Sequence, residues 1–170
     1  MNNLFSIEGK IALVTGGSRG IGEMIAAGFL ANGAKVYISS RKAEVCYETA
    51  NRVQEQYGGE CISLPADLSN LNGIESLVNS LPDGEKLDIL VNNAGASWGE
   101  PIDEYSEKGW DKVMDTNVKG VFFLTQKLLP LLRSSATAED PSRVINIGSI
   151  DGIKTCCLLY TSDAADEQFG

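Results

Sequence analysis

Three glycines in one short turn are the residues of this chain best suited to bind a ligand. The segment Thr15 to Gly22, TGGSRGIG, follows four apolar residues, Ile11 to Val14, that predict a buried parallel strand. Gly16, Gly20 and Gly22 allow the backbone to approach a ligand, and the first N–H groups of the expected helix carry partial positive charge without an intrahelical acceptor. A pyrophosphate fits such a turn. A plain strand-to-helix turn is the alternative, because the spacing differs from G-x-G-x-x-G and lacks the Lys-Ser/Thr end of a P-loop.

Two arginines could add a phosphate contact to this turn. The short strand predicted at Lys35 to Ser39 ends in Ser40 and Arg41, and Arg19 lies within the glycine turn. At the corresponding place of dinucleotide folds, a carboxylate takes the ribose 2'-hydroxyl of NAD and an arginine accepts the 2'-phosphate of NADP. Since no carboxylate stands here, the sequence favours NADPH over NADH. Each arginine could instead be a solvated surface residue.

A second polar loop follows the next long apolar run. Leu87 to Val91 predicts a buried strand, and it runs into Asn92, Asn93, Ala94 and Gly95. Ligands bind at the carboxyl edge of parallel sheets. The asparagines supply amide groups to neighbouring backbone, and the two small residues leave room for a ribose or nicotinamide.

Asn117 and Ser149 are the remaining candidates for chemistry. Asn117 falls on the apolar stripe of the longest helical pattern, Ser106 to Leu132, where an unpaired amide costs about 1 to 3 kcal/mol. It therefore needs a partner, which backbone at a helix kink could provide. Ser149 follows the strand predicted at Arg143 to Ile147, where a serine is usually a turn residue.

The composition excludes several classes of function. The chain has 170 residues, 43% of them hydrophobic and 22% charged, which is ordinary for one globular domain. It has no histidine, so a Ser-His-Asp triad cannot operate, and its net charge of -9 argues against nucleic acid or an anionic membrane as partner. The four cysteines lack metal-ligand spacing, so no metal is expected, and Cys46 and Cys61 are interpreted as core residues. No signal peptide or membrane-spanning run is present, which favours the cytoplasm.

The apolar pattern predicts how these residues are positioned. Five strands, the third at Cys61 to Ala66, alternate with helices and predict an α/β fold with a doubly wound, Rossmann-like parallel sheet in the order 3-2-1-4-5. A ligand would lie at the switch between strands 1 and 4. Four helical stripes are expected to be apolar: Ile21, Met24, Ile25, Gly28 and Phe29; Cys46, Ala50, Val53 and Tyr57; Leu71, Ile74, Leu77, Val78 and Leu81; and Trp110, Val113, Met114, Val118, Val121, Thr125, Leu128, Leu129 and Leu132.

The motifs TGGSRGIG and NNAG resemble those of the short-chain dehydrogenase/reductase family. The resemblance implies that Asp67 and Leu68 lie beside the adenine, although Asp67 could equally be a turn or capping residue. It also implies that Asn117 distorts its helix and holds a water for proton relay, and that Ser149 hydrogen-bonds the substrate carbonyl. The NADP(H)-binding residues expected from these motifs are Gly16, Ser18, Arg19, Gly20, Ile21, Gly22, Ser40, Arg41, Asp67, Leu68, Asn93, Ala94 and Gly95.

Within the family, the chain is similar to 3-oxoacyl carrier-protein reductases of the branch linked to rhamnolipid precursors. This implies NADPH-dependent reduction of a 3-oxoacyl thioester, with a small-molecule or carrier-linked acyl substrate and a homo-oligomeric (dimeric or tetrameric) full-length parent. The acidic stretch 138–140 would repel an acidic carrier. Another alcohol or sugar dehydrogenase, or a non-catalytic NADP-binding module, is the alternative.

The family pattern ends near residue 156. The family has a tyrosine about a dozen residues after the serine and a lysine four residues later, which lowers the tyrosine pKa. Here the position four residues after Tyr160 is Ala164, and no lysine or arginine comes after Lys154. The segment 157–167 also resembles a translated sequencing adapter. We therefore expect an incomplete domain at 1–156, truncated after strand 5, a non-native tail at 157–170, and no reductase activity in this chain.

Overall fold

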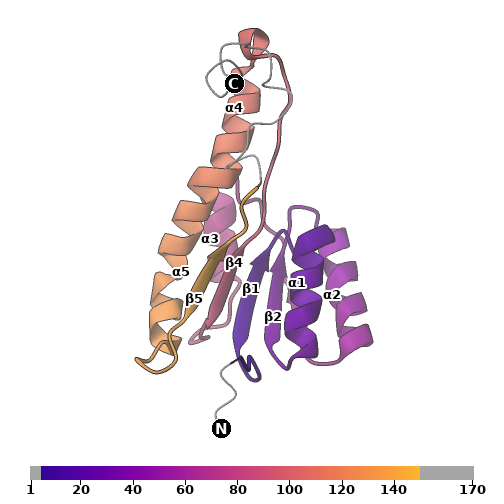
Figure 1. Cartoon of the computed structure of the whole chain (residues 1–170), viewed down its shortest axis with the longest axis vertical. Coiled ribbons are helices and arrows are strands. Elements are labelled where there is room, and N and C mark those ends of the chain that lie inside the picture. The colour runs from indigo at the N-terminus through magenta and orange to yellow at the C-terminus, as the bar shows by residue number, and fades with distance from the viewer. Residues whose placement is uncertain (1–4, 150–170) are drawn as a thin grey trace, which may run out of the picture.

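The computed structural model describes residues 5–149, which form one parallel sheet with helices on both faces (Figure 1). The strand order is β3-β2-β1-β4-β5, as the sequence predicted. The elements, in chain order, are β1 (Ile11–Thr15), α1 (Gly20–Ala31), β2 (Lys35–Ser39), α2 (Ala43–Tyr57), β3 (Cys61–Ser63), α3 (Leu71–Asn79), β4 (Ile89–Asn92), the 3-10 turn η1 (Ile102–Glu104), α4 (Glu107–Met114), the π-helical turn η2 (Asp115–Gly120), α5 (Val121–Ser135) and β5 (Arg143–Asn146). The doubly wound fold class is confirmed.

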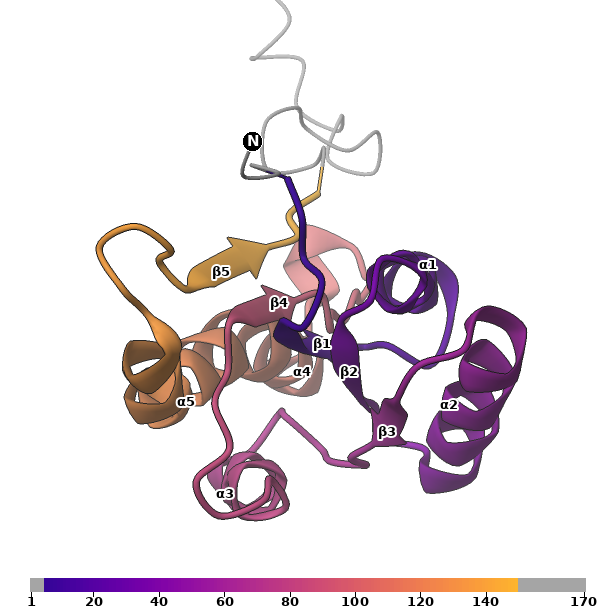
Figure 2. The ribbon, with the colours of Figure 1, turned by 90° about the horizontal axis from the view of Figure 1, so that it is seen from below.

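Two apolar cores lie on the two faces of the sheet. Helices α1 and α2 cover one face, and α3 and α5 cover the other (Figure 2). Successive residues of a strand point to opposite faces. Val14 therefore packs in the core under α1 and α2, whereas its neighbour Leu13 packs in the core under α3 and α5. The first core also contains Cys46 and Cys61, as predicted, and burial raises the pKa of the Cys61 thiol to about 11.

Helix α1 buries a different face from the one that its larger side chains predicted. Gly22, Ala26 and Leu30 are buried, whereas Ile21 and Met24 are 57% and 65% exposed. The reason is the close approach of the helix to the glycine turn: a Cβ atom on Gly22 would lie 2.2 Å from the carbonyl oxygen of Gly16. Only small residues fit at that contact. Of the predicted stripe, Ile25 and Phe29 pack partly buried against the core, whereas Ile21, Met24 and Gly28 are exposed.

The long helical pattern of residues 106–132 is one path made of three elements, α4, η2 and α5. Its predicted stripe is wrong in part, because Trp110 and Val118 are 58% and 53% exposed. The buried residues that face the sheet in α5 are Leu124, Leu128 and Leu132. The sequence stripe mixed this face with a second apolar side of the helix, which lines a groove against β5.

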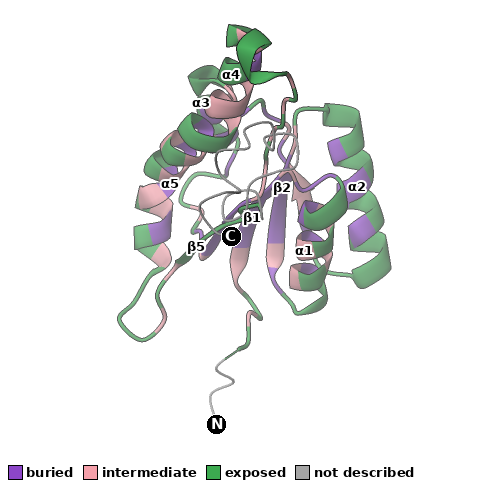
Figure 3. Ribbon diagram, turned by 45° about the horizontal axis from the view of Figure 1, so that its top comes forward, coloured by how far each residue is buried: buried purple, intermediate pink, exposed green. Residues whose placement is uncertain are grey.

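Smaller differences concern the ends of elements and stripes. Tyr57 and Leu71 are 44% and 41% exposed, although both were expected on buried faces. Strand β3 ends at Ser63 rather than at position 66, and β4 begins at Ile89, two residues later than expected. The edge strand β5 is exposed along its whole length, in contrast to the buried β1 and β2 (Figure 3).

Ion pairs fix the amino ends of the strands. The Lys10 ammonium contacts the carboxylates of Asp88 and Asp140, and the Asp140 hydrogen bond raises the pKa of Lys10. No helix within residues 5–149 is long and apolar enough to cross a bilayer. The same part of the chain contains no cluster of three or more His, Cys, Asp or Glu residues that could hold a metal ion. The predicted tail and Tyr160 lie outside the described residues.

Candidate functional site

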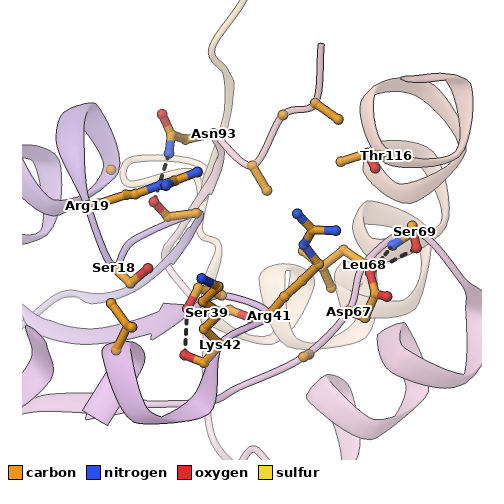
Figure 4. A pocket seen from close by; sticks show the side chains of 18 of the residues that line it. Ser18, Arg19, Ser39, Arg41, Lys42, Asp67, Leu68, Ser69, Asn93 and Thr116 are labelled. Carbon is orange, nitrogen blue, oxygen red and sulfur yellow. Dashed lines mark hydrogen bonds between the residues drawn. The ribbon is translucent and has the colours of Figure 1, made fainter. Parts of the chain in front are cut away.

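A pocket of about 380 Å³ opens at the carboxyl ends of β1, β2 and β4 (Figure 4). All the residues predicted to bind NADP(H) line it except Gly20, which begins α1 with a φ of +57°. The predicted residues in the pocket come from four segments that are far apart in the sequence. Sequence reasoning missed the lining residues Ser39, Lys42, Val45, Ala66, Ser69, Ala96 and Thr116.

The glycine turn is shaped by backbone conformation and close packing. Gly16 has a φ of +64°, in the left-handed region that favours glycine. A Cβ atom on Gly16 would lie 2.9 Å from the amide nitrogen of Asn93, and one on Gly17 would lie 2.7 Å from Cβ of Ile38. The turn therefore brings backbone against both neighbouring strands and ends at the N-terminus of α1, whose free N–H groups suit an anion.

A threonine that sequence reasoning missed joins this turn to the NNAG loop. The Thr15 hydroxyl donates to the Val91 carbonyl at 3.2 Å and accepts from the backbone N–H groups of Asn93 and Ala94, each at 2.9 Å. Asn93 in turn donates from its amide to the carbonyls of Thr15 and Gly16. The prediction that the asparagines serve neighbouring backbone is confirmed for Asn93. It is wrong for Asn92, whose amide donates to the side chains of Thr125 and Asn146. The Thr15 hydroxyl uses its one donor and both acceptor sites, which makes the junction well defined.

Three cations line the pocket. Arg19 and Arg41 extend into it from different sides, and Lys42 also lines it (Figure 4). None of these three cations forms an ion pair with another described residue. Asp67 is the one carboxylate among the described lining residues, and it accepts hydrogen bonds from the backbone and hydroxyl of Ser69. The turn role of Asp67 is thus confirmed, and the three cations are available to an anionic ligand.

Asn117 holds the chain that follows the NNAG loop. Its side-chain oxygen accepts from the Ala96 N–H, and its amide donates to the Ala96 carbonyl, both at 2.8 Å. It lies in the π-helical turn η2, so the expected helix distortion and backbone partner are both confirmed. Contrary to expectation, Asn117 is exposed rather than part of the buried stripe. Ser149 is also exposed, and it follows the carboxyl end of β5.

Comparison of the chain with known proteins identifies similar sequences. The family model described as short chain dehydrogenase matches residues 10–161. The rhamnolipids biosynthesis 3-oxoacyl-[acyl-carrier-protein] reductase of Pseudomonas aeruginosa is 55% identical over 154 residues, covering 90% of this chain and 59% of that protein. The chain therefore spans about three fifths of the length of that relative.

Solved structures agree with this result. The Pseudomonas aeruginosa RhlG/NADP active-site complex matches with a TM-score of 0.85 and 55% identity, over 92% of this chain and 60% of that one. The L-sorbose reductase of Gluconobacter frateurii, complexed with NADPH and L-sorbose, matches with a TM-score of 0.80 and 30% identity, over 87% and 55% of the two chains. The chain belongs to the short-chain dehydrogenase family.

Proposed function

We propose that this chain is the dinucleotide-binding part of an NADPH-dependent ketone reductase, and that the whole protein reduces a 3-oxoacyl thioester to the 3-hydroxyacyl form. The observation that carries the cofactor proposal is the pocket lined by Arg19, Arg41 and Lys42, with no carboxylate at the end of β2. The names of the similar proteins, a 3-oxoacyl carrier-protein reductase and an NADP complex, support the reaction and the cofactor.

The described residues fit NADP(H) part by part. The glycine turn of residues 16–22 and the N-terminus of α1 suit the pyrophosphate. Arg19, Ser40 and Arg41 would hold the 2'-phosphate, for which guanidinium groups form charge-assisted hydrogen bonds. In the proposed arrangement Asp67 and Leu68 lie beside the adenine, and residues 93–95 border the ribose and nicotinamide. When bound, NADPH supplies the hydride.

Ser149 and Asn117 are proposed for the chemical step. The Ser149 hydroxyl would donate to the substrate carbonyl oxygen, where negative charge develops as the carbonyl is reduced. Asn117 would hold a water that passes a proton. Its side chain is fixed at both polar atoms by Ala96, which suits a positioning role. The family's Tyr-x-x-x-Lys proton donor pair has no match in the 170-residue sequence, where Ala164 stands four residues after Tyr160.

We also infer the wider setting of the domain. Residues 1–156 are proposed as the dinucleotide-binding domain, and 157–170 as a tail that is not native to it. The full-length protein is proposed to be a cytoplasmic homo-oligomer that acts on a small-molecule or carrier-linked acyl substrate. Asp140 in the acidic stretch 138–140 contacts Lys10 and Arg143, which reduces its repulsion of an acidic carrier.

Two other functions are compatible with the same pocket. One is reduction of a sugar or simple alcohol substrate, as the name of L-sorbose reductase suggests for that neighbour. The other is a module that binds NADP(H) without turnover, which the missing Tyr-x-x-x-Lys pair favours for the 170-residue chain. In a full-length protein that contains the Tyr-x-x-x-Lys pair, oxidation of NADPH with a 3-oxoacyl thioester or with L-sorbose separates the two reductases. Binding of NADPH without its oxidation by either substrate would identify the module.

The cofactor proposal is tested by titrating NADPH and NADH into the 170-residue chain and its Arg41→Ala variant. We expect tighter binding of NADPH, and a loss of about 10-fold or more in NADPH affinity on substitution, because a hydrogen bond to a charged group contributes about 1.5 to 3 kcal/mol. NADH affinity should be unchanged. Arg133→Ala, which removes an exposed arginine of α5 that does not line the pocket, is the matched control. Equal affinities for the two nucleotides, unaltered in Arg41→Ala, would refute the proposal.

A further inference from the structure

The Ser39 hydroxyl is an unusual polar group in the described chain. Ser39 is completely buried, and its Oγ atom has no hydrogen-bond partner within residues 5–149. Among the described residues that are not exposed, the indole nitrogen of Trp98, a half-buried residue, is the other buried side-chain polar atom without a partner. A buried polar atom without a partner costs about 1 to 3 kcal/mol, so such atoms are rare and call for an explanation. Ser39 also lines the nucleotide pocket, which offers one.

The sheet register shows on which side Ser39 lies. Ser39 is the last residue of β2 and is paired with Thr15 in the parallel neighbour β1. Paired residues of adjacent strands direct their side chains to the same face. One pair earlier, Val14 and Ile38 both pack under α1 and α2, so Thr15 and Ser39 belong to the opposite face. Ala66, Leu68 and Ala94 border the pocket on that face. They pack in the same core as Leu13 and Tyr37.

The polar groups around Ser39 are engaged elsewhere. Its own carbonyl accepts from the Gly17 N–H at 3.1 Å. The Ser40 hydroxyl donates to the Lys42 carbonyl, and the Ser18 carbonyl accepts from the hydroxyl of Thr49. These groups therefore have hydrogen-bond partners within the described chain, whereas the Ser39 hydroxyl has none. Ser39 lies at the end of β2, directly before Ser40 and Arg41.

We infer that the Ser39 hydroxyl is a binding group for the adenosine half of the dinucleotide, and that ligand binding satisfies a hydroxyl that the unliganded chain leaves unpaired. The inference rests on the proposed nucleotide-binding function and adds a residue to it. It has a particular consequence: removing the hydroxyl should weaken binding without weakening the fold. A serine that only supports the sheet would behave in the opposite way.

The test compares the 170-residue chain with its Ser39→Ala variant by calorimetric titration with adenosine 2',5'-bisphosphate and NADPH. We expect both affinities to fall by the same factor, about 2- to 12-fold, the range for one lost hydrogen bond. The urea midpoint without ligand should stay the same or rise. Ser63→Ala, in the adjacent strand β3 and outside the pocket lining, is the matched control and should change neither affinity.

Each outcome bears on a separate statement. If the unsubstituted chain binds neither probe, the proposed function fails, and this inference fails with it. If the chain binds both probes and Ser39→Ala binds them equally well, only the role of Ser39 is refuted. A Ser39→Ala variant with a lower urea midpoint and weaker binding would indicate a structural role. Should Ser39→Ala not fold, Ser39→Cys keeps most of the volume and replaces the hydroxyl by a weak hydrogen-bonding thiol, and the same loss of affinity is expected.

Discussion

Substitution of Gly22 by alanine should destabilise the chain, although alanine is the better helix former. The new Cβ atom would lie 2.2 Å from the Gly16 carbonyl oxygen and 2.5 Å from the Asn93 amide nitrogen. Because the first of these is backbone, relief requires α1 and the glycine turn to separate. Overpacking costs about 1 to 3 kcal/mol. We expect the upper end, about 3 kcal/mol, against a helix-propensity gain of about 1 kcal/mol, so the free energy of unfolding should fall by about 2 kcal/mol.

Gly28→Ala is the matched control on the same helix. Gly28 is exposed, and a Cβ atom there would meet nothing within 4 Å. This variant should gain about 0.8 to 1.0 kcal/mol from helix propensity alone. Urea unfolding followed by circular dichroism measures both variants, and titration with adenosine 2',5'-bisphosphate should show lost binding for Gly22→Ala only. If Gly22→Ala were as stable as Gly28→Ala and bound the ligand normally, the close contact between α1 and the turn would not exist.

Two further predictions concern parts of the chain away from the pocket. Glu85 accepts hydrogen bonds from Tyr37 and Lys35 which, against the opposing effect of burial, lower its pKa below the ordinary 4.5. The stabilisation from ionised Glu85 is therefore complete above pH 4.5 and is lost as the pH falls through the lowered pKa. Glu85→Gln should be less stable than the unsubstituted chain at pH 7 by about 1.5 to 3 kcal/mol and should lose less stability on acidification. Urea unfolding at pH 7, 4 and 3 measures this, and parallel profiles for the two proteins would contradict it. On the edge strand β5, Val144 and Ile145 are 42% and 40% exposed, and an exposed apolar edge strand can pair with another chain. Ile145→Lys should therefore reduce concentration-dependent association in sedimentation velocity. An unchanged profile would show that this edge does not drive association.

The sheet could be predicted from the sequence because its signals are local. Lys35–Ser39 was predicted as a strand with the bounds that the structure gives. Buried parallel strands are short apolar runs, and glycine marks the turns between them. Alternation of such runs with helices predicts a parallel sheet, and the strand order follows from the order that is common in doubly wound dinucleotide folds.

The buried faces of the helices could not be predicted in the same way. A period of 3.6 residues shows that a stripe is apolar, but it does not show which partner covers the stripe. In α1 the residues at the contact are small, since Gly22 and Ala26 allow the helix to lie close to the sheet. In α5 apolar residues occupy two sides, and only the side of Leu124 and Leu128 meets the sheet.

The site was predictable where backbone conformation requires a particular residue, and not where a hydroxyl depends on its surroundings. Gly16 and Asn93 stand at strand ends in patterns with a direct physical meaning. Thr15 and Ser39 are instead ordinary strand residues in the sequence. Their hydroxyls differ only after folding, when Thr15 gains three partners and Ser39 none within the described chain.

The π-helical turn η2 shows why the long helix is irregular at this point. Within it, Asn117 binds the backbone of Ala96, and Thr116 lines the pocket directly. At its end, a Cβ atom on Gly120 would lie 2.5 Å from the carbonyl oxygen of Leu68, so this residue packs against the other wall of the pocket. A wider turn changes the directions of successive side chains relative to a regular helix, and such turns occur often at functional sites. The distortion thus lets one short segment support both the 67–68 turn and the chain after NNAG, which holds the two walls of the pocket in a fixed relation.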